Sequence, residues 1–284
     1  MKKIAAVVTL YNPDLSVYEN IITYANQVKV VYAVDNSDSE ISDSILEKIK
    51  SIQNLIYISE SKNLGIAKSL NIGANFAMKA NFDYLLTMDQ DSKASEKMVN
   101  ILLSVMSSHH KIAIAAAEHF NPSFHHISGE FYCKDVLYTM SSGNLLDLSI
   151  YNIVGGFKDE LFIDYVDHEY CLRLNKLGYR VIITNDTLVF HTLGKSEKKK
   201  ILGVNLYPTH HSPLRYYYRT RNRYYVNKLY ISHFPKYVRE DHKNQLREFI
   251  YLLFGEKQVL KKIKLILLGY LDYRRNKLGK YESD

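Results

Sequence analysis

The chain has 284 residues, and its 46% hydrophobic and 24% charged content is that of an ordinary globular protein. This length fits one large domain, or one domain with an appendage. Two cysteines, Cys133 and Cys171, argue against a disulfide framework and favour a reducing compartment. No uninterrupted apolar run approaches the roughly 20 residues that a membrane-spanning helix needs. The short apolar N-terminus lacks a small-residue cleavage site, so it is interpreted as a first strand rather than a signal peptide.

The net charge of +7 is unevenly distributed along the chain. Up to Tyr207 there are 20 Lys and Arg residues against 23 Asp and Glu residues, whereas beyond it there are 17 against 7. A mildly acidic body with a strongly basic, tyrosine-rich tail indicates an anionic partner for the tail. The candidates are a membrane surface, a nucleic acid and a lipid diphosphate.

The first hundred residues alternate between predicted strands and predicted helices. Short apolar runs predict strands at Ile4–Thr9, Val28–Val34, Leu55–Ile58 and Leu85–Met88. Helical spacing of apolar residues predicts helices at Leu15–Gln27, at Ile41–Ile52, after Asn63-Leu64-Gly65 and at Met98–Met106. This alternation indicates βαβ units around a mostly parallel sheet.

Polar residues follow successive strands of this predicted sheet. Asp35 follows the second strand, Asp89 and Asp91 follow the fourth, and Asn63 and Gly65 precede a helix. Each loop alone is explained by ordinary turn chemistry. In an open α/β sheet, however, ligands bind outside the carboxyl ends of the strands, so the loops together predict a nucleotide site. Two carboxylates separated by one residue suit Mg²⁺ or Mn²⁺ brought in with a diphosphate.

The second half of the chain is less regular. Glu118–Asp147 is interpreted as an irregular hairpin region, with a polar and flexible Ser141-Ser142-Gly143-Asn144 segment. Three acids, Asp164, Asp167 and Glu169, then interrupt an aromatic, apolar segment. Asp167 stands at the N-cap position of a predicted helix that closes near Gly178, and the helix dipole favours acids there. A general base beside a bound substrate is the alternative explanation, and it also accounts for acids within so apolar a stretch.

Two features of the tail leave alternatives open. Arg215–Tyr225 interleaves basic and aromatic residues, which suits either single-stranded nucleic acid or a membrane interface. Apolar residues from Val259 to Leu271 recur at helical spacing, and Lys261, Lys262 and Lys264 lie off this stripe. The stripe fits a helix packed on the body or on a second subunit, and it equally fits peripheral membrane attachment.

These motifs together resemble glycosyltransferase family 2 enzymes with the GT-A fold, and among them most closely bacterial rhamnosyltransferases. The resemblance spans about residues 4 to 222 and closes with Arg215-Tyr216-Tyr217 and Arg221-Asn222. The other matching motifs are Thr9-x-x-Asn12, Val34-Asp35-Asn36-Ser37, Asn63-x-Gly65-x-Ala67, Met88-Asp89-Gln90-Asp91-Ser92, Ser142-Gly143, Gly155-Gly156-Phe157, Phe162-Ile163-Asp164-Tyr165-Val166-Asp167-x-Glu169, Arg173, Gly178-Tyr179 and His191-x-x-Gly194. The implied fold is a Rossmann-like mixed sheet flanked by helices, with a catalytic domain at residues 1–207 and a basic helical region at residues 208–284.

The resemblance also implies a role for each matching residue. Asp35 would hold the base of a nucleotide sugar. The pocket around that base would be lined by Thr9, Asn12, Asn63 and Gly65.

Around the diphosphate, Asp89 would contact the ribose or the metal's water, Asp91 would bind the metal, and His191 would complete its shell. A lone histidine after an apolar run is otherwise more often structural.

Asp167 takes the position of the general base, with Arg173 as a supporting ion pair and Asp164 as the rival base. Many relatives have Glu-Asp where this chain has Val166-Asp167, so a single acid must act as the base here. Further residues matching acceptor or supporting positions are Ser142, Gly143, Glu169 and Arg221.

The implied activity is inverting, metal-dependent transfer of L-rhamnose from dTDP-rhamnose to a saccharide or lipid-linked saccharide of a surface polysaccharide. The expected location is the cytoplasm, at the inner face of the membrane, with peripheral membrane contact or a homo-oligomer and without nucleic acid. The same fold with a UDP-hexose or UDP-galactofuranose donor is the first alternative. A non-catalytic nucleic-acid-binding protein is an alternative of another class. A nucleotidyltransferase would show a Gly-rich basic loop after the first strand, and Thr9–Pro13 is not one.

Overall fold

A computed structural model describes residues 2–108, 110–120, 130–191, 199–201, 204–206 and 211–282. The chain divides into two compact units, one formed by Met1–Phe162 with Val166–Thr192 and the other by Ile163–Tyr165 with Leu193–Asp284. The expected domain boundary after residue 207 falls at residues outside the described ranges.

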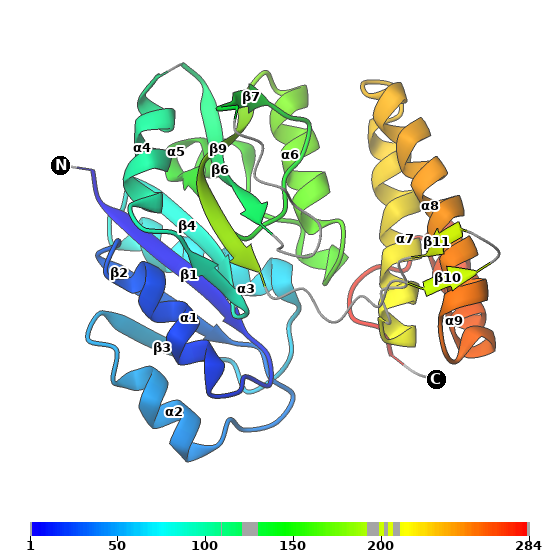
Figure 1. The fold of residues 1–284 in the computed structure, drawn as a ribbon, viewed down its shortest axis with the longest axis horizontal. Coiled ribbons are helices and arrows are strands. Elements are labelled where there is room, and N and C mark those ends of the chain that lie inside the picture. Colours follow the sequence, from blue (N-terminus) through cyan, green and yellow to red (C-terminus); the bar gives the residue numbers. More distant parts are fainter. Residues whose placement is uncertain are drawn as a thin grey trace. The chain divides into compact units, whose positions relative to one another are not determined.

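The first unit contains a mixed sheet flanked by helices (Figure 1). Its strands are β1 (Ile4–Leu10), β2 (Val30–Asp35), β3 (Leu55–Ser59), β4 (Tyr84–Asp89), β5 (Ser92–Ala94), β6 (Ile112–Phe120), β7 (Cys133–Asp135), β8 (Asn144–Asp147) and β9 (Arg180–His191). Its helices are α1 (Ser16–Ala25), α2 (Asp43–Lys50), α3 (Ile66–Lys79), α4 (Met98–Ser108), α5 (Leu148–Val154), the 3₁₀ turn η1 (Asp159–Leu161) and α6 (Val166–Lys176).

The order of the strands explains why one half of this unit is regular and the other is not. Among the described residues the order is β3-β2-β1-β4-β8-β6-β9-β5, with β7 paired to β9. Neighbours from β3 to β4 are parallel, as expected for βαβ units. β8 lies antiparallel to both β4 and β6, whereas β6 and β9 are parallel. The carboxyl ends of β2, β1 and β4 therefore share one edge of the sheet.

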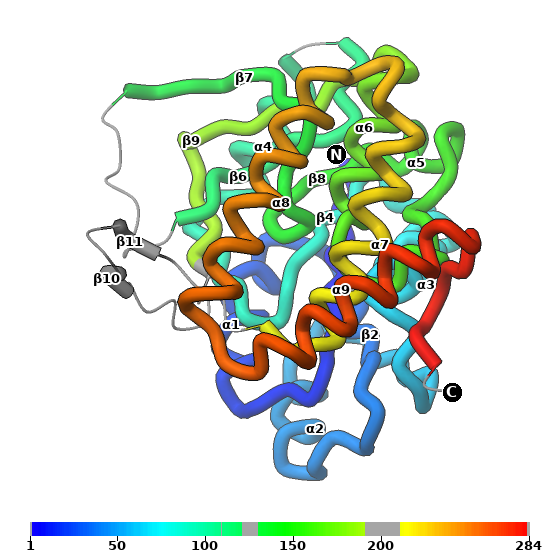
Figure 2. Tube along the Cα trace, turned by 90° about the vertical axis from the view of Figure 1, so that its right-hand side faces the viewer, coloured from blue at the N-terminus to red at the C-terminus, as the bar shows by residue number. Residues whose placement is uncertain are grey.

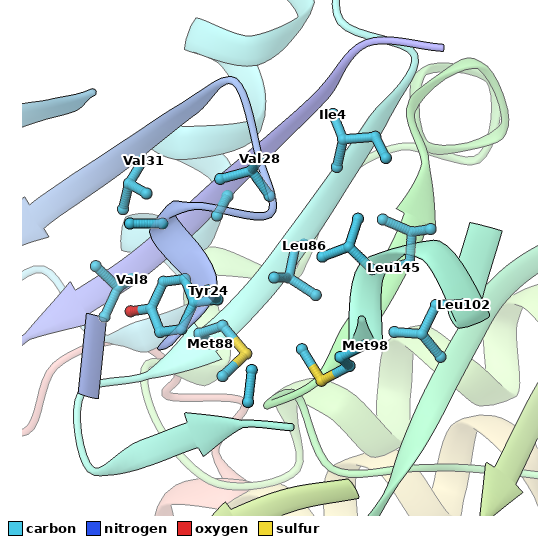
Figure 3. Packing of buried hydrophobic residues seen from close by; sticks show 14 of the residues in the cluster. Ile4, Val8, Tyr24, Val28, Val31, Leu86, Met88, Met98, Leu102 and Leu145 are labelled. Atoms are coloured by element: carbon cyan, nitrogen blue, oxygen red, sulfur yellow. The ribbon is translucent and has the colours of Figure 1, made fainter. Parts of the chain in front are cut away.

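The core of the first unit lies where helices pack on the central strands. Figure 3 shows part of it, in which Val8 of β1 and Leu86 and Met88 of β4 lie among Tyr24 of α1 and Met98 of α4. These side chains are fully or almost fully buried, because parallel central strands are covered by helices on their faces. Burying apolar side chains of this size is the main stabilising contribution to such a sheet.

The mixed α/β architecture with C-terminal helices confirms the fold class expected from the sequence. The strands and helices predicted before residue 107 are all present, with bounds that differ by a few residues. The irregular region holds β7, β8 and the end of β6, which the sequence patterns did not reveal. Helix α6 begins at Val166, so Asp167 lies in the first turn of the helix and the N-cap expected there was wrong.

The second unit is mostly helical. Its elements are α7 (Pro213–Tyr230), α8 (Pro235–Gly255), α9 (Val259–Arg274) and a small antiparallel pair, β10 (Lys199–Ile201) and β11 (Val204–Leu206). Helices α7 and α8 run beside each other in opposite directions (Figures 1 and 2). In the part of the chain that the structure describes, no helix combines the length and apolarity needed to cross a membrane.

Candidate active site

Strand pairing brings the predicted nucleotide-binding carboxylates to one edge of the sheet. Leu10 of β1 pairs with Asp35 of β2, and Thr9 of β1 pairs with Asp89 of β4. Asp35 and Asp89 therefore flank the end of the same strand. This is the edge at which ligands bind in open α/β sheets.

The Asp35 carboxylate is buried and held from both sides. The Ser37 N–H donates to its Oδ1 at 2.9 Å, and the Tyr57 hydroxyl donates to its Oδ2 at 2.5 Å. Burial, together with the bond to Asp35, raises the pKa of the Tyr57 phenol, so Tyr57 remains a donor at any working pH. The carboxylate therefore has a defined orientation, with lone pairs left to accept from a ligand. Tyr57 looks like an ordinary strand residue in sequence, and so its position beside Asp35 was missed.

The Thr9–Pro13 loop is held by a residue that the sequence analysis also missed. Gln90 accepts from the Tyr11 N–H at 2.8 Å and donates to the Tyr11 carbonyl at 3.0 Å. Next along the loop, the Asn12 N–H donates to the Ser37 hydroxyl at 2.9 Å, and Asn12 itself has φ +44°. The loop after β1 is thus tied to the loops after β2 and β4. The Thr9 hydroxyl is buried and has no hydrogen-bond partner among the described residues.

Asn63 and Gly65 shape the entry to α3. The Asn63 side chain accepts from the Gly65 N–H at 3.0 Å and donates to Asp38 at 3.5 Å. Gly65 has φ +86°, and a Cβ there would lie 2.6 Å from the Phe162 carbonyl oxygen. The Ile66 N–H donates to that same oxygen at 2.7 Å, so only glycine fits at position 65.

Asp89 is the last residue of β4, and Asp91 lies in the two-residue turn that leads to β5. The two carboxylates supply the hard oxygen atoms that Mg²⁺ or Mn²⁺ prefers, and Mg²⁺ is commonly held by one or two carboxylates plus substrate phosphates. These residues therefore fit a divalent ion that arrives with a diphosphate. The backbone of His191 pairs with Ser92, next to Asp91, but the His191 side chain lies outside what the structure describes. Within the described residues no group of three or more His, Cys, Asp or Glu side chains could hold a metal.

Ser142 and Gly143 fix the position of the end of β4. The Ser142 hydroxyl accepts from the Asp89 N–H at 3.1 Å, and the Gly143 N–H donates to the Thr87 carbonyl at 2.8 Å. The Ser142 carbonyl in turn contacts Nε2 of His119 at 2.7 Å. A Cβ on Gly143, which has φ +77°, would lie 2.2 Å from a methyl group of Val189. This step therefore supports the Asp89 backbone, and His119 is a supporting residue that the sequence analysis missed.

Asp167 is half-buried in the first turn of α6, where its Oδ1 accepts from the His168 N–H at 2.8 Å. The ring of His168 stacks on Tyr138 with centroids 4.0 Å apart, which steadies this turn. A negative charge is favoured at a helix N-terminus.

The neighbouring acid, Glu169, has a different environment. It is fully buried and forms an ion pair with Arg173 at 2.8 Å. Arg173 also donates to the carbonyls of Val154, Gly155 and Gly156 at 2.7 to 3.2 Å. Glu169 and Arg173 together hold the Gly155-Gly156 loop.

The second unit contains the two remaining candidates, Asp164 and Arg221. Asp164 forms an ion pair with Arg215 at 3.2 Å, so accepting a proton would disrupt that pair. Arg221 is fully buried, and its guanidinium donates to the Asn222 side chain and to the Gly279 carbonyl at 3.0 and 2.7 Å. Both residues are engaged in holding this unit together.

Comparisons with known proteins show which family and which fold this chain shares. Residues 6–158 match the family model described as glycosyl transferase family 2. The chain is 32% identical over 238 residues to the dTDP-rhamnosyl transferase RfbF of Shigella flexneri, and this match covers 78% of each chain. The fold is similar to that of the mannosyltransferase PcManGT of Pyrobaculum calidifontis, solved with GDP-Man and Mn²⁺. The TM-score is 0.62 and the identity 13%, and the match covers 97% of this chain and 83% of that one. The likeness to GalNAc-T7, solved with UDP, GalNAc and Mn²⁺, has TM-score 0.61, 12% identity and coverage of 84% of this chain and 49% of that one. These structures confirm the GT-A fold.

Replacing Tyr57 by Phe should test whether the Asp35 carboxylate needs its second donor. Tyr57→Phe removes only the hydroxyl, so we expect a nucleoside diphosphate to bind about tenfold more weakly, because a hydrogen bond to a charged group is lost. The turnover rate at saturating donor should be little changed. Titration calorimetry of the variant beside Tyr32→Phe, a buried tyrosine of the adjacent strand, measures this. Equal affinity in the two variants would contradict a positioning role for Tyr57.

Proposed function

The chain belongs to glycosyltransferase family 2, and from that premise we propose that it transfers L-rhamnose from dTDP-rhamnose to a saccharide acceptor, with inversion at the anomeric carbon. The choice of donor is supported by the relative from Shigella flexneri, which is described as a dTDP-rhamnosyl transferase. The observation that carries the proposal is the placement of Asp35 and Asp89 on either side of the end of β1, with Asp91 one turn beyond. One acid suits the N–H group of a pyrimidine base, and the other two suit a divalent ion that accompanies a diphosphate.

In this proposal the residues at the sheet edge bind and orient the donor. The Asp35 carboxylate accepts from the N–H group of a thymine ring. The Thr9 hydroxyl near the end of β1 and Asn12 of the following loop would line the same pocket. Asp91, with Asp89 and His191, would hold a divalent ion. Such an ion, when bound, supplies positive charge that stabilises the departing diphosphate.

Asp167 performs the proton transfer. Its carboxylate accepts the proton of an acceptor hydroxyl while that oxygen forms a bond to the anomeric carbon. The bond from this carbon to the phosphate oxygen breaks at the same time, and the nucleoside diphosphate leaves with the electron pair. A single displacement of this kind inverts the stereocentre and needs no covalent nucleophile. Asp167 is favoured over Asp164 because the Asp164 carboxylate is already bound to Arg215.

Two alternatives bear on this proposal in different ways. A UDP-hexose or UDP-galactofuranose would use the same carboxylates. Such a donor differs in the transferred sugar, in the 5-position of the base and in the 2′-hydroxyl of the ribose. Nucleic-acid binding by the tail was suggested by alternating basic and aromatic residues in α7. In the structure Tyr217, Tyr218, Arg221 and Arg223 of this run are buried, so they form no exposed surface on which bases could stack.

The acceptor and the location complete the proposal. We infer that the acceptor is the growing chain of a surface polysaccharide linked to a lipid, and that the enzyme acts at the inner face of the membrane. The basic balance of the residues beyond Tyr207 supports an anionic surface as the partner.

Removing the carboxylate of Asp91 should abolish metal-assisted binding of the donor and leave the fold intact. In Asp91→Asn we expect transfer to be nearly abolished and Mn²⁺ or Mg²⁺ to lose its effect on the binding of dTDP, because an amide is a weaker ligand for a hard cation. Calorimetric titration of dTDP with and without each metal measures the second effect without any activity assay. Asp186→Asn, an exposed acid of β9, is the control. Full activity of Asp91→Asn together with metal-independent dTDP binding would refute the assignment.

Replacing Asp167 should identify the base. General-base help contributes typically about 10²–10⁴-fold in rate, so Asp167→Asn should lose transfer in that range. Donor affinity and the folded structure should be retained, since the amide keeps the size of the side chain and can still accept from the His168 N–H. Asp164→Asn should lose much less. Initial rates and donor binding of both variants decide between the two acids, and an inactive Asp164→Asn beside an active Asp167→Asn would reverse the assignment.

A further inference from the structure

Helix α9 buries two charged side chains and exposes three leucines. The residues that it buries are Lys262, Gly269 and Asp272. On the opposite side, Leu260 is 84% exposed, Leu267 is 58% exposed and Leu271 is 46% exposed. A helix in contact only with water and its own protein core normally shows the reverse distribution.

The buried polar groups of α9 are satisfied within the second unit. The Lys262 ammonium contacts Glu256 at 2.5 Å, and the same carboxylate accepts from the Tyr216 hydroxyl at 2.8 Å. Asp272 accepts from the Tyr217 hydroxyl at 2.7 Å. In the sequence Lys262 lies off the apolar stripe with Lys261 and Lys264, but in the structure it is buried, because Glu256 binds its ammonium group.

Close packing of the two helices depends on the glycine of α9. A Cβ on Gly269 would lie 2.5 Å from the Tyr217 carbonyl oxygen, so the backbone of α7 packs directly against this residue. The inward side of α9 is therefore completed by hydrogen bonds and a close backbone contact. The leucines on its outward side are not needed for packing within the unit.

The end of α8 carries a second exposed apolar face. Phe254 is 63% exposed, and the other exposed apolar residues are spaced as one side of a helix, at Leu246, Phe249, Ile250 and Leu253. Three residues connect the end of α8 to the start of α9, so Phe254 and Leu260 lie close together along the chain. Between these helices and α7 lies a mainly apolar cavity of about 330 Å³, which Leu246 and Phe249 of α8 and Ile266 of α9 help to line.

The exposed charged side chains of α9 and of the residues that follow it, up to residue 280, are basic. From residue 257 to residue 280, every exposed charged side chain is basic, and Lys264 lies between Leu260 and Leu267 on the outward side of α9. A second copy of the chain seated on this surface would bring like charges together, which opposes association. An anionic bilayer neutralises them, and apolar side chains flanked by Lys and Arg are typical of helices that lie in a bilayer interface.

We propose that α9 and the end of α8 bind the surface of an anionic lipid bilayer, with Phe254, Leu260 and Leu267 entering the interfacial region and Lys261 and Lys264 contacting lipid phosphates. The inference deepens the proposed function by naming the surface that holds the enzyme at the membrane. It does not depend on the sugar that is transferred. Lipid phosphate and apolar chains, rather than a protein groove, are the chemistry that this surface recognises.

Sedimentation with lipid vesicles tests the proposal on the full chain. The wild type should bind vesicles of phosphatidylcholine with phosphatidylglycerol, bind much less to pure phosphatidylcholine, and dissociate as salt rises. Leu260→Ser with Leu267→Ser should weaken binding about tenfold or more, because two apolar side chains that would enter the bilayer are lost. Lys261→Glu with Lys264→Glu should have a comparable effect that largely disappears at high salt.

The matched controls come from the first unit, where Leu177→Ser and Lys79→Glu change exposed residues of the same types. Circular dichroism and dTDP binding of each variant show that the fold is retained. No binding of the wild type to anionic vesicles, or equal binding by the leucine variants and Leu177→Ser, would overturn the proposal. A wild-type dimer that Leu260→Ser with Leu267→Ser converts to monomer would assign the surface to a second copy instead. Transfer to a soluble acceptor reports on the proposed activity separately, so a failure of membrane binding and a failure of catalysis are distinguishable.

Discussion

The parallel pairing of β1 with β2 and β4 is the constraint on which the rest of the site depends. It places Asp35 opposite Leu10 and Asp89 opposite Thr9, so that two acids from distant parts of the chain flank one strand end. Because successive residues of a strand point to opposite faces, a shift of one residue in either pairing would reverse which side chains are buried. The apolar residues of β1 and β4 are fully or almost fully buried, and this burial stabilises one register. The core and the position of the carboxylates are therefore determined together.

Many polar residues around this edge support the fold rather than take part in chemistry. Ser142 accepts from the Asp89 N–H, and Gln90 holds the loop after β1. Elsewhere in this unit, Arg173 donates to the carbonyls of Val154, Gly155 and Gly156. Each provides a hydrogen-bond partner for backbone groups of a loop or strand end, and so stabilises the local structure. The proposed function assigns direct contact with the substrates to Asp35 and Asp167, and it assigns the divalent ion to Asp91 with Asp89.

Local patterns in the sequence predicted the first four strands and their helices, because helices covering both faces of parallel strands leave continuous apolar runs. They also predicted that Asp35 and Asp89 share an edge. The strands β5, β7 and β8 are only three or four residues long and are stabilised by pairing with β4, β6 and β9, so their own composition carried little signal. Tertiary contacts equally explain why the roles of Tyr57 and Lys262 were missed. A tyrosine within a strand and a lysine within a basic run show their partners, Asp35 and Glu256, only in the folded chain.

The most direct test of the account is the identity and configuration of the product formed from a set of donors. The purified chain is given dTDP-rhamnose, UDP-galactose or UDP-galactofuranose with a saccharide acceptor, and the products are examined by mass spectrometry and by the anomeric signals in the NMR spectrum. The account predicts a rhamnosylated product, formed from dTDP-rhamnose, whose anomeric configuration is opposite to that of the donor. Transfer from a UDP-sugar alone would contradict the assigned donor, and a product that retains the donor's configuration would contradict the single displacement assisted by Asp167.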